Sequence, residues 1–298
     1  MYTLNFVAMW QQLLQQLLAS DTKALARAIS LVENEVEGYE EFMRSLPVND
    51  SARIIGITGP PGAGKSTIAD ALISAFNEDG GRTCVLCVDP SSPFTYGALL
   101  GDRIRMSTWH DNPQVFIRSL AARGNLGGLN PKVIEITEIV KAAGFSQIII
   151  ETVGVGQSEV EIAGLADVTI VVVVPESGDE IQTMKSGLME VANIFVVNKS
   201  DRPGADKLMQ NLHSMHTPDR EIPIIKTVAS QKIGISELKE KILAFIKDHD
   251  LQRNLRVLAN RAYHLLQAKK MKGITREGIY IDLQSAGDVN IYKFIENY

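Results

Sequence analysis

Residues 59–67 constrain this chain more than any other feature. They read Gly59, Pro60, Pro61, Gly62, Ala63, Gly64, Lys65, Ser66 and Thr67. A β-branched run over 53–58 precedes them and a helical pattern over 68–76 follows, which is the GxxxxGK[ST] pattern in the strand–loop–helix context of a phosphate-binding loop. Backbone N–H groups at the glycines and the start of the helix attract phosphate. We therefore expect a nucleotide site, with Lys65 on the β- and γ-phosphates and Ser66 as a ligand of Mg²⁺.

The rest of the chain predicts the fold that carries such a loop. Short apolar runs alternate with helical stretches, and the runs cover 53–58, 83–88, 147–152, 168–174, 193–197 and 224–227. This alternation predicts an α/β fold of the P-loop NTPase type, a mostly parallel sheet with helices on both faces.

Three regions are expected along the chain. A helical appendage spans 1–50, the P-loop domain spans 51–248, and a C-terminal helix and arm span 249–298. In the arm, the β-branched run Ile279–Leu283 suggests a strand or a small hairpin. The glycine-rich segment between residues 89 and 128 suggests a long irregular loop of the kind that carries function.

Composition excludes several classes of protein. The 298 residues are 45% apolar and 22% charged with a net charge of −5, so we expect a globular chain without nucleic acid as a partner. The apolar runs are too short for a membrane span and the start lacks the basic segment of a signal peptide, which favours a cytoplasmic protein with no membrane partner. Cys84 and Cys87 exclude a disulfide framework. Because they lie three apart on one expected strand, we expect two buried thiols on opposite faces.

Two carboxylates at strand ends can serve the metal and the γ-phosphate. Glu151 closes the run 147–152, where it can hold Mg²⁺, and the N–H of Gly154 can approach the γ-phosphate. Asp89 follows the run 83–88 and emerges at the same edge of a parallel sheet. Asp89 and Asp102 are candidates to bind Mg²⁺ or to position the attacking water. The alternative for each is an aspartate exposed in a surface loop.

A third motif predicts which base is bound. The NKxD pattern follows the run 193–197 and consists of Asn198, Lys199, Ser200 and Asp201. The Asp201 carboxylate can accept hydrogen bonds from guanine N1–H and the 2-amino group, and adenine offers neither donor. Lys199 can lie along the base plane. A backbone N–H after the last expected strand can bind guanine O6, from the segment Val228, Ala229 and Ser230. The expected ligands are therefore GTP or GDP with Mg²⁺.

Together these motifs resemble the MeaB/ArgK family, GTPases of the SIMIBI class that are similar to the human methylmalonic aciduria type A protein. The segments that carry the resemblance are 24–33, 59–67, 88–92, 116–119, 127–128, 151–159 and 198–201. The resemblance implies a chaperone of an adenosylcobalamin-dependent acyl-CoA mutase, usually methylmalonyl-CoA mutase. Such a chaperone gates cofactor loading and protects or reactivates the mutase. The resemblance also implies a homodimer joined through C-terminal segments.

The same resemblance implies a mobile loop over 175–185, in which Asp179 and Lys185 have a candidate role when the mutase activates hydrolysis. We expect slow intrinsic hydrolysis that the partner accelerates. Lys185 is the first candidate for the group that the mutase brings in, because its ammonium group can neutralise charge that develops on the phosphates. Asp102 or Arg118 is the next candidate for this switch. A solvated helical lysine is the alternative for Lys185.

Other classes stay open on the sequence. A P-loop kinase of a small molecule is one, and a preference for ATP would distinguish it. A metallochaperone-type GTPase is another, although it needs dense His and Cys ligands and the histidines here are scattered. A P-loop protein that binds GTP without turnover is a third. A targeting GTPase of the signal-recognition type would need a Met-rich helical domain, whereas the nine methionines are spread along the chain.

Overall fold

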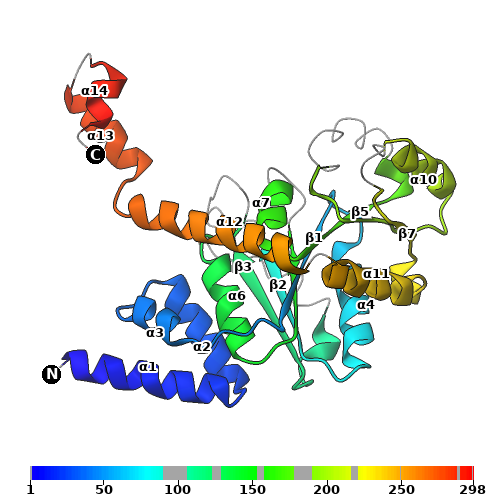
Figure 1. Ribbon diagram of the computed structural model, residues 1–298, viewed down its shortest axis with the longest axis horizontal. Helices are drawn as coiled ribbons and strands as arrows, with labels where there is room; N and C mark the ends of the chain where they lie inside the picture. Colours follow the sequence, from blue (N-terminus) through cyan, green and yellow to red (C-terminus); the bar gives the residue numbers. More distant parts are fainter. Residues whose placement is uncertain are drawn as a thin grey trace.

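The computed structural model describes residues 2–89, 106–122, 129–152, 158–177, 190–215, 221–248, 250–286, 289–296 and 298. These residues contain a seven-stranded sheet in which every neighbouring pair is parallel (Figure 1). Its strands are β1 (Arg53–Thr58), β2 (Thr83–Asp89), β3 (Val115–Ala121), β4 (Gln147–Glu151), β5 (Val168–Val173), β6 (Ile194–Val197) and β7 (Ile224–Lys226). Their order is β3-β2-β4-β1-β5-β6-β7, so β1 lies at the centre. Because parallel strands end at one edge, the motifs that follow β1, β4, β6 and β7 meet there.

Helices cover both faces of this sheet and extend beyond it. They are α1 (Tyr2–Leu18), α2 (Thr22–Glu33), α3 (Tyr39–Ser45), α4 (Lys65–Asn77), α6 (Val133–Ala142), α7 (Ser158–Leu165), α10 (Ala205–Ser214), α11 (Ile235–Asp248), α12 (Asp250–Lys270), α13 (Arg276–Ala286) and α14 (Ile291–Ile295). Helices α6 and α7 pack on one face, α4 and α11 pack on the other, and α10 packs against β6 and β7. The expected α/β architecture is confirmed. None of the helices in the described ranges is long and apolar enough to cross a membrane.

The two cysteines lie on β2 as expected. Both side chains are buried, Cys84 in the apolar cluster beneath α6 and α7 and Cys87 in the cluster beneath α4 and α11. Alternate residues of a strand point to opposite faces, so residues three apart are separated by the sheet. Burial raises the pKa of the Cys84 thiol, which keeps it protonated and inert.

Three N-terminal helices enlarge the core on the α6 face. Asp21 caps α2, because its carboxylate accepts hydrogen bonds from the backbone N–H groups of Lys23 at 2.8 Å and Ala24 at 3.3 Å. Leu25 and Ile29 are buried at one helical face and belong to the same apolar cluster as the sheet residues below them. In Figure 1 these helices lie beside α6.

One strand of the sheet was not predicted from the sequence. Residues 115–121, expected within an irregular segment, form β3, which pairs with β2 from Thr83 opposite Val115 to Asp89 opposite Ala121. As an edge strand, β3 is less completely buried than a central strand such as β5, since its middle residues are only half-buried. The pairing partner, which the local sequence does not reveal, decides its conformation.

The C-terminal arm is helical, so the strand or hairpin suggested for Ile279–Leu283 is wrong. These residues lie inside α13, whose first turn is capped by the Thr275 hydroxyl accepting from the Gly278 N–H at 3.0 Å. No residue of α13 is buried, and none of the strands in the described ranges pairs with residues 279–283. In Figure 1, α12 crosses the α6–α7 side of the sheet and leads to α13 and α14 beyond it.

Candidate nucleotide site

The loop between β1 and α4 has the backbone that glycine alone adopts without strain. Gly59, Gly62 and Gly64 all have positive φ, at +138°, +76° and +88°. A Cβ atom on Gly59 would lie 2.1 Å from the carbonyl oxygen of Val172, and one on Gly64 would lie 2.4 Å from the amide nitrogen of Asn198. The loop is therefore curled tightly against β5 and the NKxD segment. A tightly curled, glycine-rich backbone of this kind can present several N–H groups to one phosphate.

Lys65 begins α4 and its side chain turns back over the loop. The ammonium group donates to the carbonyl oxygens of Gly59 at 2.9 Å and Pro60 at 3.1 Å, and the residue is 6% exposed. Gly64, which precedes the helix, has no side chain to cap its first turn. The site thus combines a held cation with the N-terminal end of a helix, and both favour phosphate oxygens.

The Ser66 hydroxyl and Glu151 meet at the same point from different elements. Ser66 Oγ donates to Glu151 Oε1 at 2.7 Å, although the residues are 85 apart in sequence. Glu151 ends β4 beside Ile57 of β1 and is 5% exposed. A buried carboxylate and a hydroxyl are oxygen donors of the type that Mg²⁺ prefers, so these residues fit a magnesium site.

Other residues expected on the metal side are only partly placed. The backbone of Asp89 ends β2 at the same sheet edge, two residues beyond Cys87, which lies opposite Glu151. The Asp89 side chain, Gly154, Asp102, Asp179 and Lys185 lie outside the described residues.

Asn198 ties three parts of the site together. Its amide nitrogen donates to the carbonyl oxygen of Ala63 at 2.9 Å. Its amide oxygen accepts from the Thr227 hydroxyl at 3.0 Å and the Ala229 N–H at 3.2 Å. The residue is 3% exposed, so these bonds satisfy a buried amide. The side chain of the first NKxD residue therefore fastens β6 to the phosphate loop and to the segment after β7.

A cavity of about 160 Å³ lies beside Asn198 at the strand ends. Its lining residues are Gly64, Thr67, Asn198, Lys199, Asp201, Arg202, Val228, Ala229 and Ser230. Lys199 adopts a left-handed backbone with φ of +54°, and its ammonium group donates to the Gly62 carbonyl oxygen at 2.8 Å. The motifs that the sequence assigned to phosphate and to base thus share one cavity, with Asp201 in its wall.

Two arginines make contacts that the sequence does not reveal. Arg202, which directly follows the NKxD motif, lines the cavity and forms an exposed ion pair with Glu176 at the start of the loop after β5. Arg118 was a reserve candidate for the catalytic site, but its guanidinium donates to Glu33 of α2 at 2.9 Å and to the Ser30 hydroxyl at 3.0 Å. In this structure Arg118 holds the N-terminal helices against β3.

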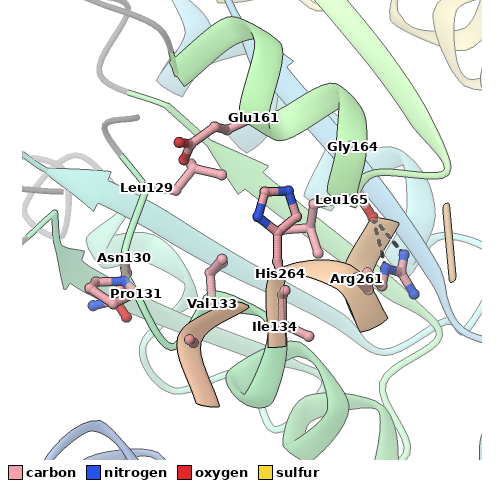
Figure 2. Close-up of a pocket in the computed structure, with 11 residues that line it drawn as sticks. Leu129, Asn130, Pro131, Val133, Ile134, Glu161, Gly164, Leu165, Arg261 and His264 are labelled. Atoms are coloured by element: carbon pink, nitrogen blue, oxygen red, sulfur yellow. Dashed lines mark hydrogen bonds between the residues drawn. The ribbon is translucent and has the colours of Figure 1, made fainter. Parts of the chain in front are cut away.

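A second cavity, of about 230 Å³, lies between α6, α7 and α12 (Figure 2). Its walls are mainly apolar, and Glu161 of α7 and His264 of α12 project into it. Burial raises the pKa of Glu161, an effect that His264 opposes. Arg261 of α12 closes one side, where its Nε and Nη2 atoms donate to the carbonyl oxygen of Leu165 at 3.2 and 2.5 Å. The sequence of α12 is largely polar, so nothing in it indicates that Arg261 is buried.

Comparison with known proteins identifies close relatives of this architecture. The family model described as "Methylmalonyl Co-A mutase-associated GTPase MeaB" matches residues 25–278. A putative GTPase of Pyrococcus abyssi is 46% identical over 243 residues, covering 78% of this chain and 75% of the relative. The GTPase ArgK of Escherichia coli is 34% identical over 246 residues, covering 78% and 74%.

Two further matches are to a much longer protein and to a solved structure. A protein of Geobacillus kaustophilus named fused isobutyryl-CoA mutase is 36% identical over 237 residues, which are 73% of this chain and 22% of that protein. A solved structure described as an LAO/AO transport system kinase superposes with a TM-score of 0.64 at 23% identity, covering 92% of this chain and 90% of that one. The structural match supports the fold.

Proposed function

Because this chain belongs to the MeaB family of mutase-associated GTPases, we propose that it acts as a chaperone of an adenosylcobalamin-dependent acyl-CoA mutase. In this proposal, GTP binding and hydrolysis gate the loading of the cofactor and protect or reactivate the mutase. The fused relative carries the argument for the partner: a region similar to this chain and a protein named as an isobutyryl-CoA mutase occur in one polypeptide. Methylmalonyl-CoA mutase is the partner that the family description favours.

The NKxD cavity supports a guanine site. Asp201 in its wall would accept from guanine N1–H and the 2-amino group, while Lys199, held on the Gly62 carbonyl, would lie along the base. The segment 228–230 would offer a backbone N–H to O6. Adenine would leave the Asp201 carboxylate without these donors, and this is the physical basis of the preference.

The phosphate loop supports binding of the triphosphate. Lys65 would exchange its two carbonyl acceptors for oxygens of the β- and γ-phosphates, and the N–H groups of residues 59–67 would surround them. Ser66 and Glu151 would hold Mg²⁺, which neutralises charge that develops on the phosphates. Asp89 and Asp102 are proposed as further ligands, and Gly154 as a donor to the γ-phosphate.

We propose that hydrolysis is slow until the mutase binds. Lys185 is the candidate group that the partner brings to the phosphates, and completion of such a site is worth on the order of 10³-fold or more in rate. A homodimer through the C-terminal arm is part of the same proposal. The exposed apolar residues of α12 and of the arm beyond it, such as Leu258, Leu266 and Tyr292, support it.

The deciding experiment measures GTP hydrolysis with and without purified methylmalonyl-CoA mutase or isobutyryl-CoA mutase. We expect stimulation of the wild-type protein and capture of the mutase in the presence of a non-hydrolysable GTP analogue. Lys185→Ala should retain basal turnover and lose stimulation, whereas Lys207→Ala, an exposed lysine of α10, should behave as wild type. Absence of binding and stimulation by both mutases would refute the chaperone proposal, and a preference for ATP would favour the kinase alternative.

A further inference from the structure

Two buried threonine hydroxyls join the strand that enters the phosphate loop to the strand that carries Glu151. The Thr152 hydroxyl donates to the Thr58 hydroxyl at 2.9 Å, and the residues are 1% and 0% exposed. Thr58 is the last residue of β1 and directly precedes Gly59. Thr152 directly follows Glu151. The pair therefore lies between the start of the phosphate loop and Glu151, the proposed ligand of Mg²⁺.

The hydroxyl pair extends the strand pairing beyond its last backbone link. The ladder between β1 and β4 ends with Ile57 opposite Glu151, followed by the Thr152 N–H donating to the Ile57 carbonyl oxygen at 3.0 Å. After this point β1 turns into the loop at Gly59. The direction in which residues 151 and 152 leave the sheet is thus restrained by the hydroxyl bond as well as by the backbone.

The pair also acts on the residue that Ser66 holds from the other side. Ser66 Oγ donates to one carboxylate oxygen of Glu151, and the main chain immediately after Glu151 is fastened to Thr58. Glu151 is therefore connected to both ends of the phosphate loop, through Ser66 at its end and through Thr152 and Thr58 at its start.

We propose that Thr58 and Thr152 are positioning residues for the metal side of the nucleotide site. Their hydroxyl bond holds Glu151 at the distance from the loop at which it and Ser66 bind one Mg²⁺ ion together. The inference rests on the metal role that the proposed function gives to Glu151. Packing alone does not require the hydroxyls, because two buried polar groups that satisfy each other can be replaced by apolar groups of the same shape with little loss of stability. Outer groups that orient a metal ligand commonly matter roughly tenfold or more for metal affinity.

The test uses the full chain and three variants of the pair: Thr152→Val, Thr152→Ser, and the double variant Thr58→Val/Thr152→Val. The readouts are the Mg²⁺ concentration at half-maximal GTP hydrolysis, GDP affinity in EDTA, and thermal unfolding. Thr169→Val is the matched control, because Thr169 is also fully buried, on β5, and its hydroxyl has no hydrogen-bond partner among the described residues. Glu151→Gln is measured in parallel.

We expect the Mg²⁺ requirement to rise roughly tenfold in Thr152→Val and in the double variant. GDP affinity in EDTA should stay the same, Thr152→Ser should restore the wild-type profile, and Thr169→Val should match wild type. The double variant keeps the test valid if Thr152→Val alone is unstable, since it leaves neither hydroxyl unsatisfied. Wild-type Mg²⁺ profiles in both valine variants, beside a shifted Glu151→Gln profile, would overturn this inference alone. A wild-type profile in Glu151→Gln would overturn the metal role of Glu151 and this inference with it.

Discussion

Replacing Asn198 by alanine tests whether the NKxD segment and the phosphate loop form one unit. The side chain makes three hydrogen bonds to separate segments: to the Ala63 carbonyl oxygen, from the Thr227 hydroxyl, and from the Ala229 N–H. With 3% exposure, the site offers little water to replace them. Asn198→Ala should therefore destabilise the protein and also weaken nucleotide binding, since the loop and the base cavity lose their common support.

The magnitude follows from the three bonds. Each contributes about 1 kcal/mol net, so the variant should lose about 3 kcal/mol of the free energy of unfolding. For a domain of this size that corresponds to a melting temperature lower by roughly 5–10 °C. Because the Ala63 carbonyl belongs to the loop, the affinity for GDP should fall as well, beyond what partial unfolding explains.

The assay is urea unfolding followed by fluorescence, with nucleotide titration of the folded protein at the same temperature. Asn211→Ala is the matched control, because Asn211 is exposed on α10 and its loss should change stability by less than about 0.5 kcal/mol. A loss below about 0.5 kcal/mol in Asn198→Ala would refute the structural argument. Loss of stability with unchanged GDP affinity would refute the claim that Asn198 couples the loop to the base cavity.

Three further predictions test other parts of the molecule. Asp201→Asn should lower GTP affinity by roughly a hundredfold or more and favour xanthosine nucleotides, whose 2-oxo group suits an amide donor; unchanged GTP binding by titration calorimetry would contradict the guanine assignment. Gly59→Ala should abolish GDP binding because its Cβ would lie 2.1 Å from the Val172 carbonyl oxygen, whereas Gly80→Ala, with φ of +76° but open space around it, should bind GDP normally. Arg261→Ala should cost about 2–3 kcal/mol of stability in urea unfolding because it removes the buried bonds to Leu165; the exposed Arg256→Ala on the same helix is the control, and equal stability of the two variants would argue against a role for Arg261.

Much of the nucleotide site was predictable because its chemistry depends on residue types at short spacing. The loop 59–67 needs glycines where φ is positive, and the structure has positive φ at Gly59, Gly62 and Gly64. The NKxD motif is likewise recognisable from four adjacent residues that follow a buried strand. Parallel strands then bring these short motifs to one edge without any further information.

Other features were hidden because they depend on residues distant in sequence. β3 was read as irregular since its conformation depends on pairing with β2, and Ile279–Leu283 was read as a strand or small hairpin from its β-branched residues alone. Arg118 belongs to a motif of the family, yet its guanidinium contacts α2, which is 85 residues away at Glu33. No local pattern distinguishes such an arginine from a catalytic one.

The amino-acid sequence alone is sufficient to predict the fold class, the family and the guanine nucleotide. Glycines at fixed positions and a carboxylate after a buried strand are compatible with few other folds or ligands. Only the folded chain decides which side chains act together. It brings Ser66 to Glu151 across 85 residues and Thr58 to Thr152 across 94, and it gives Arg261 a carbonyl partner 96 residues away. The physical reason is that a hydrogen bond is short-ranged and directional, so its partner is set by the packing of whole elements and not by the local sequence.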